Sequence, residues 1–155
     1  MTATTNHARP VTVRQLRPAD HADWVRLWSG YLAHYDEAMP QAQVRHTFDR
    51  LCVGEALHGF VAEVDGRVSG FVHCLFHPST WTPTDYCYLQ DLFVDPTARR
   101  GGIARALIAR VTGLARHRGA SRVYWLTGTG NAAARALYDQ VAEDTGLMQY
   151  RIFLP

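Results

Sequence analysis

Apolar and polar residues alternate in several parts of this chain, which is the pattern of a half-buried strand. Val11–Arg17 shows this alternation and predicts the first strand. Leu57–Val64 and Val68–Phe76 predict two more strands, and Asp65-Gly66 between them favours a tight hairpin turn. The apolar run from Tyr88 to Val94 predicts a further strand at the centre of the fold.

Apolar residues three and four positions apart indicate helices elsewhere. Asp20 suits the N-cap of the first helix. The predicted helices run from about Asp20 to Tyr35, from Gln41 to Val53, from Ile103 to about Gly119, and from Asn131 to about Ala142. Arg122–Thr127 and Leu147–Leu154 predict two final strands. This order of elements predicts an α/β or α+β fold with a mixed sheet.

Size and composition bound the class of protein. The chain has 155 residues, and we expect one domain at residues 11–155 behind a frayed tail at residues 1–10. Its net charge of +2 is too weak and too scattered to favour nucleic-acid binding. Three cysteines without metal-ligand spacing favour a reduced, cytoplasmic protein that holds no metal. We also expect no membrane span and no signal peptide, because no apolar run is long enough.

The strongest chemical signal follows the central strand. Asp95-Pro96 ends that strand, and Arg99–Gly102 leads into the helix that begins near Ile103. Backbone N–H groups at a helix start have no partner in the helix, and the helix dipole favours an anion there. The two arginines add positive charge, so this segment suits a phosphate or pyrophosphate. Neither the P-loop ending nor the dinucleotide fingerprint is present, which disfavours a nucleotide hydrolase.

Two motifs identify a family. Arg99–Ala104 matches Q/R-x-x-G-x-G/A, the pyrophosphate signature of the GCN5-related N-acetyltransferases (GNAT). Asn131–Tyr138 matches the N-x-x-A-x-x-L-Y motif of the same family and follows the first motif after one predicted strand. The chain resembles this family from Val11 to its end, with a pattern closest to the branch that acts on histones, polyamines or D-amino acids. The resemblance implies a mixed central sheet with a splayed pair of parallel strands, flanked by helices.

The same resemblance implies acetyl-CoA as cosubstrate and direct attack by a primary amine in a ternary complex. It implies that Tyr138 donates a proton to the leaving thiolate and that Asn131 bonds the pantetheine region. Backbone groups of Leu92, Phe93 and Val94 would hold the pantetheine as a strand would. The pyrophosphate would lie on the loop and first helical turn, at Arg99, Arg100, Gly101, Gly102, Ile103, Ala104 and Arg105.

The general base is the open point. Gln90 stands where this branch of the family often has a glutamate, and an amide cannot take a proton. Asp91 is next, but strand alternation turns it to the opposite face unless a bulge re-aims it, so a purely structural role stays open. Asp85, Glu63 and His77 acting through water are alternatives. The missing glutamate also leaves open a catalytically idle acyl-CoA-binding module.

Four residues are candidates for contact with the acceptor amine, namely Tyr31, Tyr35, Trp81 and Asp85. The two tyrosines lie on the first predicted helix, where their rings can pack while their hydroxyls reach a cleft. His73 and His77 lie on one predicted strand. Without a further ligand nearby, they indicate satisfied or surface histidines rather than a metal site.

The C-terminal segment predicts an assembly. The sheet of this family usually ends with two antiparallel strands after the tyrosine helix, whereas this chain has room for one, Leu147–Leu154. An absent strand leaves unpaired backbone groups at a sheet edge, which invites pairing with another chain. We therefore expect a homodimer in which the C-terminal strands meet or exchange.

Overall fold

A computed structural model describes residues 9–155 of the chain. Most of the predicted N-terminal tail, residues 1–10, lies outside the described residues. The chain forms two compact units, one ending at Tyr124 and the other comprising Trp125–Pro155. The expectation of one domain over residues 11–155 stays a prediction.

The first unit is built on a mixed sheet of five strands. In spatial order they are β1 (Val11–Gln15), β2 (His58–Val64), β3 (Arg67–His77), β4 (Tyr86–Val94) and β5 (Arg122–Tyr124). All neighbours are antiparallel except β4 and β5, which run parallel. Asp65 (φ 52°) and Gly66 (φ 74°) turn β2 into β3 with the two left-handed residues that a tight hairpin turn needs. The predicted mixed sheet and hairpin are therefore confirmed.

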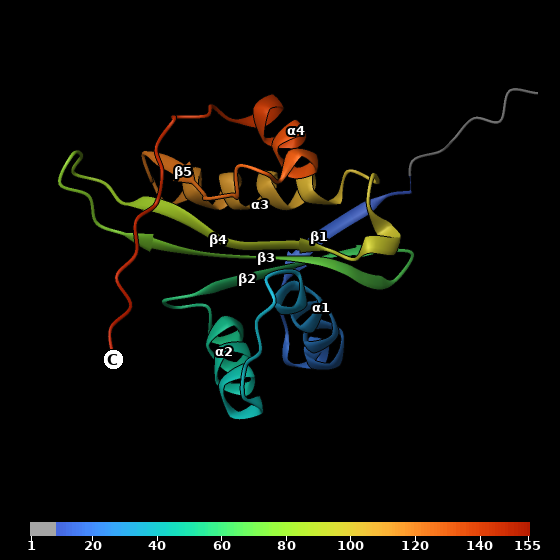
Figure 1. Ribbon diagram of the computed structural model, residues 1–155. Coiled ribbons are helices and arrows are strands. Elements are labelled where there is room, and N and C mark those ends of the chain that lie inside the picture. The colour runs from blue at the N-terminus through green and yellow to red at the C-terminus, as the bar shows by residue number, and fades with distance from the viewer. Residues whose placement is uncertain (1–8) are drawn as a thin grey trace, which may run out of the picture. The chain divides into compact units, whose positions relative to one another are not determined.

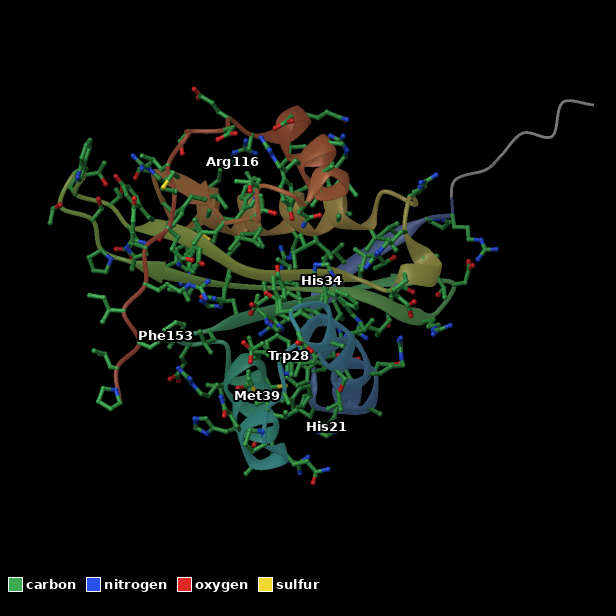
Figure 2. All side chains as sticks on the ribbon, viewed as in Figure 1. His21, Trp28, His34, Met39, Arg116 and Phe153 are labelled. Atoms are coloured by element: carbon green, nitrogen blue, oxygen red, sulfur yellow. The ribbon has the colours of Figure 1, made fainter. Side chains whose placement is uncertain are left out.

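Helices cover both faces of this sheet. Figure 1 shows α1 (His21–His34) and α2 (Gln41–Val53) on one face and α3 (Ile103–His117) on the other. Beneath α1 and α2 the core is strongly aromatic. Trp28, labelled in Figure 2, stacks on Trp24 with ring centroids 5.4 Å apart and also contacts Phe71 of β3 at 5.9 Å. These contacts fix the face of α1 that meets the sheet.

The junction before α1 differs in detail from the prediction. Asp20 directly precedes α1, but its carboxylate makes no capping bond to the helix. It accepts two bonds of 2.7 Å from the Arg14 guanidinium and one of 2.8 Å from the Arg17 backbone N–H. The arginine on β1 competes successfully for the carboxylate because a charged, forked donor forms stronger bonds than a backbone amide.

The second unit contains α4 (Ala132–Val141), which begins as predicted after Asn131. The predicted strand Leu147–Leu154 is wrong, since these residues form no strand in the structure. A strand needs a neighbour for its backbone groups, and no described strand pairs with this segment. Its apolar side chains are left 75–89% exposed. The strand predicted to end at Thr127 also stops earlier, at Tyr124.

Candidate active site

β4 and β5 are paired over only part of their length. Tyr88 and Tyr124 form the last paired positions, after which β5 ends whereas β4 continues to Val94. Among the described strands, none pairs with Leu89–Val94 on the β5 side. An unpaired strand edge of this kind can bind extended ligands that carry amide groups. This is the predicted splay of two parallel strands.

The loop between β4 and α3 has the backbone shape of an anion site. Arg100 (φ 66°) and Gly102 (φ 77°) adopt left-handed conformations, and Gly102 is the N-cap of α3. Left-handed residues among right-handed ones turn successive N–H groups toward one side and form a concave nest for an anion. The first turn of α3 adds its own unpaired N–H groups and the positive end of its dipole. The backbone of this loop and of the first turn of α3 therefore fits a diphosphate group.

Asp95 fixes the start of this loop. Its buried carboxylate accepts bonds from the Thr97 backbone N–H at 3.0 Å and the Thr97 hydroxyl at 2.7 Å. Arg26 of α1 donates a third bond at 2.7 Å, and Arg67 a longer one at 3.3 Å. The bonds from Thr97, followed by the Arg26 guanidinium, lower the pKa of Asp95 below its usual value. A single carboxylate thus ties the loop to α1 and to β3.

The predicted cofactor residues of this loop divide into two groups. Arg99, Arg100 and Arg105 are exposed and leave positive charge at the surface, with Arg99 bonded through Nε to the Val94 carbonyl at 3.3 Å. Ile103, in contrast, is 2% exposed and anchors the start of α3 on the sheet. A methyl group added at Gly70 would lie 3.0 Å from the Ile103 side chain, so glycine there permits the close approach.

β4 carries a bulge at Gln90. Asp91 pairs with His73 and Leu89 pairs with Cys74, which leaves Gln90 without a partner on β3. The extra residue shifts the alternation, and Asp91 therefore points to the face covered by α1, where the Tyr31 hydroxyl reaches it. This settles the question that the sequence left open about the direction of Asp91.

A hydrogen-bonded cluster surrounds Asp91. The Tyr31 hydroxyl donates to its carboxylate at 2.8 Å, and His73 lies 2.9 Å from its other oxygen. Trp24 donates its indole N–H to His73 at 3.0 Å, and Tyr35 packs edge-on to Tyr31 at 5.1 Å. The structure thus brings together three of the predicted site residues. His73 and Trp24 were missed, although His73 is the satisfied histidine that the sequence favoured.

Other candidates for the base are engaged elsewhere. Glu63 lies on β2, separated from β4 by β3, and accepts a 2.7 Å bond from Arg14. His77 uses both ring nitrogens, one with the Pro78 carbonyl at 2.8 Å and one with the Tyr124 hydroxyl at 2.7 Å. Trp81 (85% exposed) and the exposed Asp85 lie on the loop before β4, where the structure gives them no contact with the Asp91 cluster.

A cavity of about 260 Å³ lies between α1 and the end of β4. Its walls include Gly30 and His34 of α1, Phe93 of β4 and Arg99 of the loop. A methyl group added at Gly30 would lie 3.0 Å from the Phe93 ring, so the absence of a side chain lets α1 pass close to β4. Phe93 also contacts the Tyr31 ring at 6.2 Å, which places the cavity next to the Asp91 cluster.

The two residues of the second predicted motif belong to the unit Trp125–Pro155. Asn131 accepts a 3.4 Å bond from the Ala134 N–H and so caps α4. Tyr138, two turns along that helix, packs edge-on against Trp125 at 5.3 Å. Their predicted roles toward the cosubstrate stay predictions.

The described residues show neither a metal cluster nor a membrane-spanning helix. Between residues 9 and 155, no three His, Cys, Asp or Glu side chains gather closely enough to hold a metal ion. In the same range, no helix combines the length and the apolar character needed to cross a membrane.

A splayed pair of parallel strands beside a helix start that fits a diphosphate is the arrangement that the motifs predict for an acyltransferase. The family follows from comparison with known sequences. The profile of the acetyltransferase (GNAT) family matches residues 21–142, so this chain belongs to that family and is an acyltransferase.

Individual relatives agree with this assignment. The chain is 33% identical over 144 residues to the D-amino-acid N-acetyltransferase HPA3 of Saccharomyces cerevisiae, covering 91% of this chain and 89% of the relative. It is 32% identical over 125 residues to a thialysine N-epsilon-acetyltransferase of Caenorhabditis elegans, covering 79% and 76%. Among solved structures, AAC(6')-Iy in complex with a CoA-linked bisubstrate analogue has a TM-score of 0.80 at 20% identity, covering 94% and 99%, which shows the shared fold.

Proposed function

We propose that this chain is an N-acetyltransferase that moves the acetyl group of acetyl-CoA to the primary amine of a small amino acid or related compound. The observation that carries the proposal is the open edge of β4 next to the left-handed loop at Gly102. The relatives named for D-amino-acid and thialysine acetylation support an amino-acid acceptor. Polyamines and protein lysines remain within the same reaction class.

Different parts of the protein would bind different parts of acetyl-CoA. The N–H groups around Gly102 and the first turn of α3 would hold the diphosphate of acetyl-CoA, with Arg99, Arg100 and Arg105 adding charge. The free edge of β4 at Leu92–Val94 would bond the pantetheine amides. When bound, acetyl-CoA supplies an activated acyl group as a thioester.

Tyr138 would act as the general acid. Its position two turns after Asn131 matches the family motif, and a phenol can protonate a leaving thiolate. Asp91 is the best candidate among the carboxylates for receiving the proton of the acceptor amine. The alternatives are weaker, because Glu63 is bonded to Arg14 and Gln90 cannot take a proton.

The first experiment is isothermal titration of the protein with acetyl-CoA, followed by thiol release with D-alanine, thialysine and spermidine as acceptors. Binding together with turnover of at least one amine is expected. Binding without turnover of any amine would favour the second candidate, an idle acyl-CoA-binding module, which the glutamine at position 90 motivates. No binding at millimolar acetyl-CoA would reject both.

We further propose a homodimer and a cytoplasmic location. The exposed, alternating segment Leu147–Leu154 supports the dimer, since its backbone and apolar side chains suit pairing with a second copy. The three cysteines, Cys52, Cys74 and Cys87, are all free, which suits a reducing compartment.

A further inference from the structure

A chain of hydrogen bonds runs from the interior of α1 through β3 to the bulged strand β4. The Trp24 indole N–H meets His73 Nε2 at 3.0 Å, and His73 Nδ1 meets Asp91 Oδ2 at 2.9 Å. The other oxygen of Asp91 accepts the Tyr31 hydroxyl at 2.8 Å. This series of hydrogen bonds thus has one end inside the aromatic core and the other at a tyrosine that is only partly buried.

The donors fix where each proton lies. An indole nitrogen can only donate, so His73 Nε2 must accept and its proton must be on Nδ1. His73 therefore donates to Asp91 and is neutral in this arrangement, since a second proton on Nε2 would break the bond to Trp24. Both oxygens of Asp91 accept, which is the arrangement of an ionised carboxylate.

Tyr31 lies at the outer end of this hydrogen-bond network. His73 is 4% exposed, and Asp91 is half-buried with both oxygens engaged, whereas the half-buried Tyr31 lies at the end of the series of hydrogen bonds. Burial, followed by the charge of Asp91, raises the pKa of Tyr31, so the phenol keeps its proton while its oxygen retains a lone pair for an incoming donor. The titratable groups that face Tyr31 and Asp91 are Tyr35 from α1 and His73 from β3.

We propose that Tyr31 is a catalytic residue that passes a proton from the acceptor ammonium to Asp91, in place of a carboxylate at Gln90. This inference rests on the proposed function. One N–H bond of the ammonium breaks and its proton moves to the Tyr31 oxygen, while the Tyr31 O–H proton moves to Asp91. The freed lone pair of the nitrogen attacks the thioester carbon and the C–S bond breaks.

The protons balance over a turnover. Of the three protons on the ammonium, one reaches Asp91 and later solvent, one leaves the nitrogen and ends on the released thiol, and one stays on the amide. His73 and Trp24 are positioning residues in this scheme. They keep one oxygen of Asp91 occupied and hold the other toward Tyr31, and the Trp24 bond keeps His73 neutral so that it does not compete for the proton.

The test compares Tyr31→Phe and Asp91→Asn with the wild-type protein in kcat/KM for D-alanine and thialysine between pH 6 and 10. Tyr86→Phe is the matched control, because Tyr86 is a buried tyrosine of β4 whose hydroxyl has no hydrogen-bond partner. At pH 7 we expect losses of about 10²–10³-fold for both relay variants, within the range of general acid–base catalysis. Above the pKa of the amine, where the acceptor is already deprotonated, the losses should shrink to less than about 10-fold.

A second pair of variants tests the positioning roles. Trp24→Phe removes the N–H that holds His73, whereas Trp28→Phe makes the same change in the same aromatic stack at an indole N–H that has no partner. Only the first variant should change the pH profile of kcat/KM, because the Trp24 N–H is the bond that holds the His73 proton on Nδ1, facing Asp91.

The possible outcomes distinguish a failure of the proton relay from a failure of the proposed function. Absence of turnover by the wild-type protein with both amines rejects the amino-acid acceptor and the relay with it. Wild-type turnover together with a loss in Tyr31→Phe that is equal at every pH, or with no loss, rejects the relay alone. A control Tyr86→Phe that behaves like Tyr31→Phe rejects it as well.

Discussion

Replacing Asp95 should loosen the loop on which the proposed cosubstrate site depends. In Asp95→Ala, the loop loses two short bonds from Thr97 to a buried carboxylate and the ion pair with Arg26. Bonds to a charged group contribute about 1.5–3 kcal/mol each, and we take the lower end for each Thr97 bond. The Arg26 side chain is 38% exposed and its pair is screened by water, so it adds at most about 1 kcal/mol. We expect a loss of about 3–4 kcal/mol in the free energy of unfolding.

The assay is urea unfolding followed by circular dichroism, with acetyl-CoA titration on the same samples. Asp23→Ala is the control, because Asp23 pairs with the same arginine at 3.4 Å with its side chain 48% exposed, and it should cost less than about 0.5 kcal/mol. A loss below about 1 kcal/mol in Asp95→Ala would refute the claim that Asp95 organises the loop.

The same carboxylate predicts a dependence on pH. Because the pKa of Asp95 is lowered in the folded protein, its stabilisation is fully present above the ordinary aspartate pKa of about 3.9 and disappears as the pH falls through the lowered value. The difference in the free energy of unfolding between the wild-type protein and Asp95→Asn should therefore be largest near neutral pH. It should shrink as the pH falls below about 4. A gap that does not change between pH 7 and pH 3 would contradict this assignment.

Three further predictions concern the cosubstrate, the acid and the assembly. Gly102→Ala places a side chain at φ 77°, which costs about 1–2 kcal/mol and should weaken acetyl-CoA binding roughly 5–30-fold in titration, whereas Gly113→Ala inside α3 should leave binding unchanged. Tyr138→Phe should lower kcat by about 10²-fold or more with little change in acetyl-CoA affinity, and an unchanged kcat would return Tyr138 to a packing role. Sedimentation should show a dimer that is lost when residues 147–155 are deleted, and a wild-type monomer at high micromolar concentration would reject the dimer.

Much of the fold was readable from periodicity. α2 has the predicted bounds, Gln41–Val53, because Pro40 precedes it and Gly54 (φ 71°) ends it. The hairpin at Asp65-Gly66 and the glycine start of α3 are also confirmed, since left-handed residues have a clear sequence signature. The failure at Leu147–Leu154 has a physical cause: alternation shows that a segment suits a strand, but only a neighbouring strand makes it one.

The site was predictable in its backbone and less so in its side chains. Gly102 and the residues around it carry a local motif, whereas the direction of Asp91 depends on a bulge that pairs with another strand. His73 was recognisable as a satisfied histidine, but its partners Trp24 and Asp91 are distant in sequence and no local pattern links them.

The bulge at Gln90 also gives β4 one residue that its pairing with β3 does not require. Gln90 is exposed and unpaired on β3, so most substitutions there should leave the fold intact. Deleting the residue makes Leu89 and Asp91 neighbours opposite Cys74 and His73, so the ladder becomes regular and Asp91 still faces α1. Tyr31 and His73 should therefore keep their common acceptor in the deletion variant. In a library of single-residue changes, position 90 should therefore tolerate almost any side chain and also its own removal.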